Sequence, residues 1–352
     1  MLAPALRERY DLSLSQIGVV LAAGWVGTTV TLLPWGLLAD RIGERAVLAG
    51  GLGGCAAATA GAAYAPGFLS LCALLGVGGA AGAGVNSATG RAVMTWFEPG
   101  ERGFALGVRQ TAIPLGGLVA AVSLPLLPDV RTSFLFLAGL CLLGAFVGLV
   151  VLRDAGDGVE PEAVPWTLRD GRLWRLCVGS GLYLIAQVAL MSFTVLFLHD
   201  ERGFSTGEAA AVLAVSQGLA VAARIGAGTW SDRLRARVVP LRRVGFASFA
   251  TVALVAALAG APVWLLVPAL ALAGALSMSW NGLSFTAAAE LAGRARSGAA
   301  IGFQQTVLSV IGIGAPIAFA AAVSATSWRA AFALAALFPL AGVWLLRPLA
   351  ER

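Results

Sequence analysis

The chain has 352 residues, of which 59% are hydrophobic and only 12% are charged. A soluble globular domain carries about a quarter charged residues, so this composition excludes a water-soluble fold and indicates an integral membrane protein. The net charge of +6 is due to arginine alone, since the chain contains no lysine. In a membrane protein such an excess is typical of cytoplasmic loops rather than of nucleic-acid binding.

Eleven apolar runs follow one another along the chain, and each has the roughly 20 residues or more that a helix needs to cross a bilayer. They lie at 15–38, 46–65, 67–96, 103–127, 132–152, 172–198, 207–230, 242–260, 262–289, 298–323 and 328–347. The stretch 153–171 is rich in glycine, proline and acidic residues and separates five runs from six. The sequence therefore predicts an all-α integral membrane protein with an N-terminal bundle at 1–152, a linker at 153–171 and a C-terminal bundle at 172–352.

The two halves repeat each other at an almost constant offset. Shifts of 192 to 195 residues place Asp40-Arg41 on Asp232-Arg233, Asn86 on Asn281, and 107-GVRQT-111 on 302-GFQQT-306. This repeat indicates a duplicated helical bundle. The helix expected at about 176–198 then has its partner before Met1, so we expect the eleven visible helices to belong to a twelve-helix protein whose first helix is missing from this chain.

The distribution of arginine predicts the orientation in the membrane. Sixteen arginines lie in the loops on the linker's side, five lie in the loops on the other side, and three lie inside helices. Because cytoplasmic loops carry the excess of positive charge, we expect the linker and the C-terminus to face the cytoplasm and the protein to span the cell membrane.

Two charged stretches, 36-GLLADRIGER-45 and 228-GTWSDRLRAR-237, interrupt the apolar sequence at equivalent turns. Asp40 at a helix end can accept hydrogen bonds from the N-terminus of a neighbouring helix, where the helix dipole favours an anion. Gly43 permits a tight turn, and Arg41 and Arg45 can anchor the next helix at the interface. The alternative is anchoring alone, which would require neither the aspartate nor the glycine spacing.

The pattern Gly36-x-x-x-Asp40-Arg41-x-Gly43-x-Arg45 resembles the loop signature of the major facilitator superfamily. The second copy, at Gly228, Asp232 and Arg233, departs from it at Arg235, where a glycine is expected, and we expect this arginine to weaken the turn. The resemblance implies two bundles, a substrate site near the midplane between the halves, and a cytoplasmic gate formed by Gly36, Asp40, Arg41, Gly43, Arg45, Asp232 and Arg233.

Polar side chains inside the predicted helices are the candidates for contact with a substrate. The candidates are the amides Asn86, Gln110, Gln187, Asn281, Gln304 and Gln305 and the arginines Arg91, Arg109 and Arg224. No acidic residue lies well inside a predicted helix, so the three guanidinium groups need water, a partner or a ligand. We therefore expect an anionic substrate.

The three arginines differ in their alternative roles. Arg91 is about five residues from Trp96 and can reach the cytoplasmic interface or bond backbone carbonyls. Arg224 occupies a place where many members of the resembled family carry arginine whatever they transport. Arg109, beside Gln110, is the strongest candidate for a ligand contact.

Two further motifs have structural interpretations. The glycine-rich stretch 76-GVGGAAGAG-84 has no preceding strand, so Gly78-x-x-x-Gly82 predicts a close helix-packing face rather than a nucleotide loop. The four cysteines, Cys55, Cys72, Cys141 and Cys177, lie in or beside apolar runs and are expected to pack as small core residues, without disulfides or metal.

The leading functional hypothesis is a monomeric secondary transporter of a small solute that works without a cofactor, either coupled to an ion, for which a proton is the candidate, or by exchange. The second is a non-transporting sensor or an inactive truncated relative of the same fold. A membrane enzyme is disfavoured, because no metal-ligand pair and no cluster of histidine, aspartate and serine lies in the predicted helices. A channel is disfavoured by the repeat and the linker.

Overall fold

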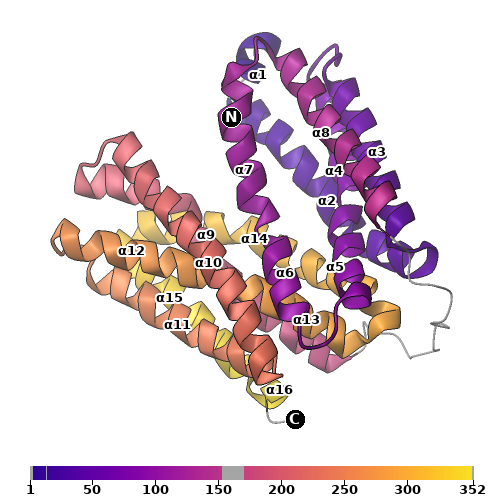
Figure 1. Ribbon diagram of the computed structural model, residues 1–352. Coiled ribbons are helices and arrows are strands. Elements are labelled where there is room, and N and C mark those ends of the chain that lie inside the picture. Colours follow the sequence, from indigo (N-terminus) through magenta and orange to yellow (C-terminus); the bar gives the residue numbers. More distant parts are fainter. Residues whose placement is uncertain (1–2, 13, 153–169, 351–352) are drawn as a thin grey trace. The chain divides into compact units, whose positions relative to one another are not determined.

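The computed structural model describes residues 3–12, 14–152 and 170–350, and every regular element within these ranges is helical (Figure 1). The predicted all-α membrane fold with a duplicated bundle is confirmed. Most of the predicted linker at 153–171 lies outside the described residues.

Nine segments of the described residues are long and apolar enough to cross a membrane. They are Ala22–Ile42, Phe68–Trp96, Val130–Val151, Gly171–Arg202, Gly207–Leu234, Val238–Ala257, Val263–Ala292, Ser297–Ala325 and Trp328–Leu349. The predicted spans at 46–65 and 103–127 are not among them. The helix that covers the first span, Glu44–Ala62, is rich in glycine and begins with two charged residues, and the second span is broken into two short helices at Thr111. The count of eleven therefore stays a prediction.

The described residues form two compact units that do not follow the two halves of the sequence. Unit 1 comprises 1–96, 112–167 and 292–306, and unit 2 comprises 97–111, 168–291 and 307–352. Each unit thus includes one short segment from the opposite half of the chain. The division into bundles at 1–152 and 172–352 stays a prediction.

Unit 1 is built around four long helices and the fragments that join them. Its elements are α1 (Ala3–Tyr10), α2 (Leu14–Ile42), α3 (Glu44–Ala62), α4 (Phe68–Gly82), α5 (Gly84–Trp96), α7 (Ala112–Ser123), η1 (Leu124–Leu126), α8 (Val130–Val151), η3 (Arg294–Arg296) and the start of α14 (Ser297–Ala325). Within it, α2 packs along α4, and α3 packs along α8.

Glycines let α2 and α4 approach each other closely. A Cβ at Gly27 would overlap the carbonyl of Gly76, and a Cβ at Gly79 would overlap the carbonyl of Gly24. The helix-packing face predicted at Gly78 and Gly82 is present, although the closest approach between helices lies elsewhere. Both face α3 at ordinary van der Waals distances, because their positions on the helix point away from α2.

Unit 2 holds most of the second half. Its elements are α6 (Arg102–Gln110), α9 (Gly171–Arg202), α10 (Thr206–Leu234), α11 (Val238–Ala257), α12 (Val263–Ser277), α13 (Trp280–Ala292), the rest of α14, α15 (Trp328–Leu345) and α16 (Arg347–Ala350). A large apolar core includes Phe197, Phe319 and Phe332. Here α11 packs along α15, as α3 does along α8 in unit 1.

The repeat predicted from the sequence appears in the helix boundaries. A shift of 192 carries α2 onto the bounds of α10, and a shift of 195 carries α4 onto the bounds of α12. The interruption after α4 at Ala83 recurs after α12 at Met278. The same shift of 192 carries α1 onto residues 195–202 at the end of α9. The rest of the helix expected before Met1 stays a prediction.

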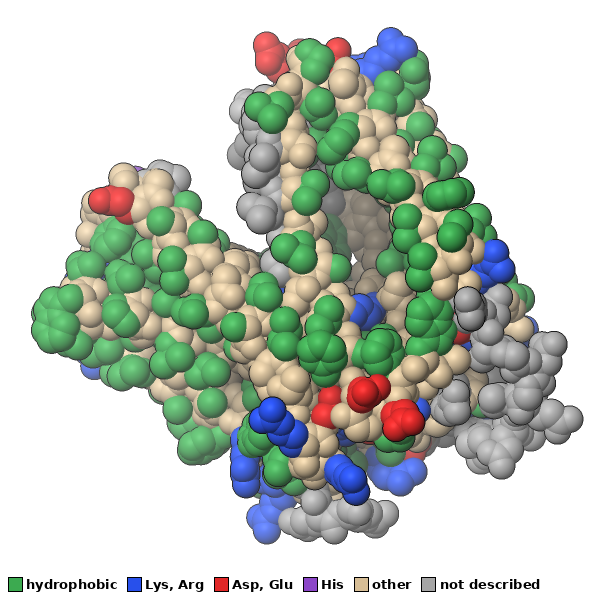
Figure 2. Space-filling model, in the orientation of Figure 1, with side chains coloured by type: hydrophobic (Ala, Val, Ile, Leu, Met, Phe, Trp, Pro, Cys, Tyr) green, Lys and Arg blue, Asp and Glu red, His purple; other side chains and the backbone are tan. Residues whose placement is uncertain are grey.

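The outer surfaces of the helices are apolar. Figure 2 shows hydrophobic side chains along the lengths of the helices and charged side chains gathered mainly near their ends. Trp264, Trp344 and Leu69 are 72%, 74% and 79% exposed. Such surfaces are stable against lipid, and helices satisfy their own backbone hydrogen bonds there.

Candidate functional site

In unit 1, Asp40 binds the start of α14. Its carboxylate lies in the last turn of α2 and accepts hydrogen bonds from the backbone N–H groups of Gly298 and Ala299 at 3.0 and 2.8 Å. Gly36, one turn earlier, allows the contact, since a Cβ there would lie 2.5 Å from the Gly298 carbonyl oxygen. The hydrogen bonds that the sequence led us to expect of Asp40 are therefore present, and its role as a gate stays a prediction.

Arg91 is paired with two acidic side chains of unit 1. Its Nε lies 3.4 Å from Oδ1 of Asp40, and its Nη1 donates to Oε2 of Glu44, whose side chain is fully buried. The expectation that no acid balances the intramembrane arginines is wrong for Arg91. Sequence reasoning missed Glu44 because it follows Gly43 in a charged loop, whereas the structure starts α3 at this residue and turns it inward.

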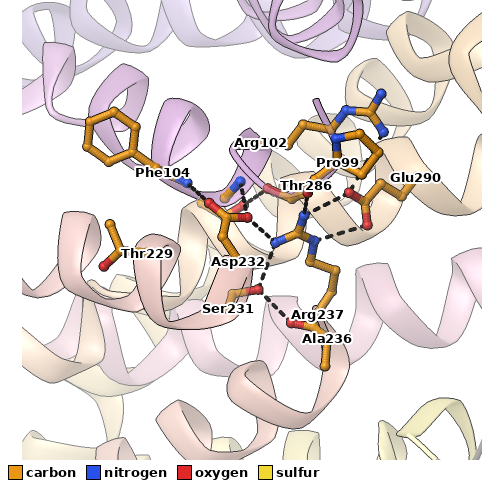
Figure 3. Close-up of polar contacts among 12 residues, drawn as sticks. Pro99, Arg102, Phe104, Thr229, Ser231, Asp232, Ala236, Arg237, Thr286 and Glu290 are labelled. Atoms are coloured by element: carbon orange, nitrogen blue, oxygen red, sulfur yellow. Dashed lines mark hydrogen bonds and ion pairs between the residues drawn. The ribbon is translucent and has the colours of Figure 1, made fainter. Parts of the chain in front are cut away.

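In unit 2, Asp232 makes the equivalent contact with the start of α6 (Figure 3). It accepts hydrogen bonds from the backbone N–H groups of Gly103 at 3.0 Å and Phe104 at 2.7 Å. Gly103 and Gly298 are 195 residues apart, as the repeat requires. Once the partner of one aspartate is known, the repeat identifies the partner of the other.

Arg237 links Asp232 to further groups of unit 2 (Figure 3). Its guanidinium pairs with Asp232, donates to both oxygens of Glu290 at 3.0 Å, and donates to the carbonyl of Pro99. Burial works against its charge, but the bonds to Glu290 and Asp232 outweigh this and hold the pKa of Arg237 above its usual range. From the sequence, Arg237 is the last position of the second copy of the loop signature, and its partners were not predicted.

Both charged loops make their turns with a positive φ. Gly43 has φ 86°, and Arg235, at the equivalent position, has φ 50°. The second turn is complete: the Arg235 and Ala236 N–H groups donate to the carbonyls of Asp232 and Ser231. Arg235 therefore does not prevent the tight turn, although it adopts a conformation that favours glycine. The remaining predicted gate residues, Arg41, Arg45 and Arg233, are exposed.

Two predicted site arginines of unit 2 meet at Gln110. Arg224 is 6% exposed, and its guanidinium donates through Nη1 to the Gln110 carbonyl and through Nε to the Met278 carbonyl, both at 2.9 Å. Arg109 donates to the side-chain Oε1 of Gln110 at 3.2 Å. Unit 2 thus brings two positive charges to one residue.

The carbonyl of Gln110 is available for a reason visible in the sequence. In a continuous helix it would accept a bond from the N–H four residues later, but that residue is Pro114, which has none. Met278 lies at the interruption between α12 and α13. Arg224 therefore uses two carbonyls at points where helices are broken.

The other predicted amides divide between the units. In unit 2, Asn281 donates through Nδ2 to Oε1 of Gln187 at 3.4 Å, joining α13 to α9 near the Met278 break. In unit 1, Gln304 is buried, while Asn86 and Gln305 are half-buried. The structure thus brings together Arg109, Gln110 and Arg224, and separately Gln187 and Asn281.

Glycines hold the elements around Arg224 close together. A Cβ at Gly228 would overlap the Gly103 carbonyl, one at Gly107 would lie 2.9 Å from the Arg224 carbonyl oxygen, and one at Gly282 would lie 3.1 Å from the Gly107 backbone. α6, α10 and α13 therefore meet backbone to backbone. This close packing positions the guanidinium against the two carbonyls.

Comparisons with known proteins agree with this architecture. A family model described as the Major Facilitator Superfamily matches residues 1–316. The chain is 33% identical over 352 residues to an uncharacterized MFS-type transporter of Mycobacterium tuberculosis, covering 98% of this chain and 79% of the relative. It is 25% identical over 354 residues to a probable sulfoacetate transporter of Cupriavidus necator, covering 90% of this chain and 80% of the relative.

Among solved structures, the fold is similar to that of FucP, a transporter crystallised in the outward conformation. The TM-score is 0.79 with 19% sequence identity, and the match covers 98% of this chain and 92% of that chain. At this identity the likeness concerns the fold alone.

Proposed function

The chain belongs to the Major Facilitator Superfamily, and from this premise we propose that it is a secondary transporter that moves a small organic anion across the cell membrane by alternating access. It is a multi-pass membrane protein. We further propose that the linker and the C-terminus are cytoplasmic, that the protein acts as a monomer, and that a proton is the coupling ion.

The observation that carries the anion proposal is the environment of Arg224. Its guanidinium is buried and bonded to two backbone carbonyls. Carbonyls satisfy hydrogen-bond donors but leave the net positive charge uncompensated, and a buried charge is costly unless a counter-charge reaches it. A carboxylate or sulfonate from the substrate would supply that counter-charge and match the planar fork of the guanidinium.

Neighbouring groups support the same substrate class. Arg109 adds a second positive charge through its bond to Gln110, and the pair of amides at Gln187 and Asn281 can complete the hydrogen bonds of a polar ligand. The relative named as a probable sulfoacetate transporter points to the same chemistry, because sulfoacetate carries a carboxylate and a sulfonate.

The two aspartate contacts support the transport cycle. Asp40 holds the start of α14, and Asp232 holds the start of α6, so each aspartate binds a helix contributed by the opposite half of the sequence. Alternating access moves the two halves against each other. We propose that these bonds close the cytoplasmic gate and that they break and re-form once in each cycle.

The test is binding to the purified full chain, read as a shift in melting temperature. The panel contains carboxylates and sulfonates, sulfoacetate among them, with uncharged amides and amines of similar size. We expect anions alone to raise the melting temperature, and we expect Arg224→Gln to abolish that rise. The control variant is Arg172→Gln, which removes the same charge from an exposed arginine paired with Asp170.

Each anion that raises the melting temperature is then tested for uptake into proteoliposomes that contain the protein. Arg224→Lys retains the charge but loses the planar fork, so we expect weakened binding rather than none. Stabilisation by a cationic or uncharged solute, or unchanged anion binding by Arg224→Gln, would disprove the anion proposal.

A further inference from the structure

Two cysteines on different helices of unit 1 lie next to each other. The sulfur atoms of Cys55 on α3 and Cys141 on α8 are 3.8 Å apart, and both residues are half-buried free thiols. From the sequence, all four cysteines were expected to pack as small core residues without disulfides. The transport function does not use these two.

The packing of α3 on α8 determines this proximity. A Cβ at Gly148 would lie against Leu48, and one at Gly144 would lie 3.2 Å from Leu52. The two helices are antiparallel, so moving four residues forward on α3, from Leu48 to Leu52, corresponds to moving four residues back on α8, from Gly148 to Gly144. The next position in this antiparallel register places Cys55 opposite Cys141.

The same register continues past the cysteines. Ala62 lies seven residues after Cys55 on α3, and Phe134 lies seven residues before Cys141 on α8. Both belong to one buried apolar cluster. Because α3 and α8 pack together along their lengths and the contacts at Gly148 and Gly144 keep this register, the meeting of the thiols follows from helix packing.

We propose that Cys55 and Cys141 form a dithiol modification site that closes to a disulfide with a lipid-soluble disulfide reagent. The first thiol attacks the reagent's S–S bond, forming a mixed disulfide and releasing one thiol. The second thiol attacks the mixed disulfide, forming the Cys55–Cys141 bond and releasing the other reagent thiol. The reagent takes up two electrons and two protons in total.

The closed site links α3 to α8 within unit 1. A short side-chain movement brings the sulfurs from 3.8 Å to bonding distance, about 2.05 Å. The bond closes a long loop of the chain and restricts the unfolded state. We expect it to raise the melting temperature of the protein. This inference does not depend on the transport function.

The test uses 4,4′-dithiodipyridine on the full chain in detergent. The variant Cys72→Ala/Cys177→Ala keeps only the proposed pair, and the matched control Cys55→Ala/Cys141→Ala keeps only the other two cysteines. Cyanogen bromide then cleaves at Met94 and Met191, which places Cys55 and Cys141 on different fragments. The same cleavage separates Cys72 from Cys177, so the two variants are read in the same way.

In the pair-only variant we expect fragments 2–94 and 95–191 to migrate together and to separate on reduction. The intact mass should fall by two hydrogen atoms, with no pyridylthio group retained. In the control variant the fragments should separate, and each cysteine that reacts should keep its label. Two labels on the pair-only chain, or thiols that react only after denaturation, would overturn the proposal.

Discussion

At the scale of single residues, the turn of the second charged loop requires a strained backbone conformation at Arg235. It adopts φ 50° at the position equivalent to Gly43. The left-handed conformation raises the free energy of a residue with a side chain by roughly 1–2 kcal/mol, whereas for glycine the increase is almost zero. The bonds of the turn to Asp232 and Ser231 hold the arginine there.

We therefore expect Arg235→Gly to stabilise the protein by about 1 kcal/mol. The measurement is the thermal unfolding of the purified variant, followed by intrinsic tryptophan fluorescence. The counterpart is Gly43→Ala, which should lower stability because its φ of 86° and ψ of 163° suit glycine alone. A lower melting temperature for Arg235→Gly would show that the arginine side chain makes a contribution larger than the strain.

The pair of Glu44 and Arg91 is the second feature at this scale. Glu44 is fully buried and Arg91 is 12% exposed. Removing one member of a buried ion pair leaves the other charge uncompensated and costs about 3–5 kcal/mol. Because Arg91 also lies 3.4 Å from Asp40, we place the cost at the lower end.

We expect Glu44→Gln to lower the free energy of unfolding by about 3 kcal/mol. A double-mutant cycle gives the sharper measurement. Glu44→Arg alone should be severely destabilised, and adding Arg91→Glu should recover part of the loss, because the swap restores opposite charges at the same place. Additive effects of the two changes would show that the residues do not interact.

At the scale of helices, glycine decides how closely α6 and α10 pack. Gly228 and Gly103 meet through their backbones, and Gly107 lies against the Arg224 backbone. The same contact supports two features of unit 2: the Asp232 cap on α6 and the position of the Arg224 guanidinium against Gln110. Displacing α6 from α10 would therefore affect both.

The variant Gly228→Ala tests this packing. The added methyl group would overlap the Gly103 carbonyl, so we expect a loss of about 1–3 kcal/mol of stability together with weaker anion binding. The control is Gly226→Ala on the same helix, where an added Cβ meets nothing within 4 Å. Equal melting temperatures for the two variants would contradict the backbone-to-backbone contact.

At the scale of the whole molecule, the duplication repeats a capping contact as well as helices. Asp40 and Asp232 lie 192 residues apart, and each receives two backbone N–H bonds at the start of a helix. A carboxylate at a helix N-terminus gains from the helix dipole and from charge-assisted hydrogen bonds. The proposed gate thus has two related contacts.

We expect Asp40→Asn and Asp232→Asn each to slow transport, because the amide keeps the shape of the side chain but loses the charge. The measurement is uptake into proteoliposomes of the anion identified by the binding panel. Correct insertion is checked by comparing melting temperatures and yields with those of the parent protein. Normal uptake by both variants would show that the two loops only anchor helices at the membrane surface and do not form a gate.

The sequence by itself determined the class of fold and its duplication. A bilayer offers no hydrogen bonds to the backbone, so long apolar runs must form helices, and the constant offset between Asp40 and Asp232 or Asn86 and Asn281 exposes the repeat. The predicted bonding of Asp40 to a helix start also follows from local rules, since helix ends carry unsatisfied N–H groups.

Only the tertiary structure decided which charges meet. Arg91, Arg109 and Arg224 all lie in apolar runs, and the sequence alone does not show which group each one binds. Arg91 is neutralised by Glu44, 47 residues away, while Arg224 is held by the carbonyls of Gln110 and Met278, 114 and 54 residues away. Such pairings depend on the register between packed helices, which glycine contacts such as Gly103 with Gly228 determine. Composition and periodicity define the helices, but the register between them arises only when their surfaces pack.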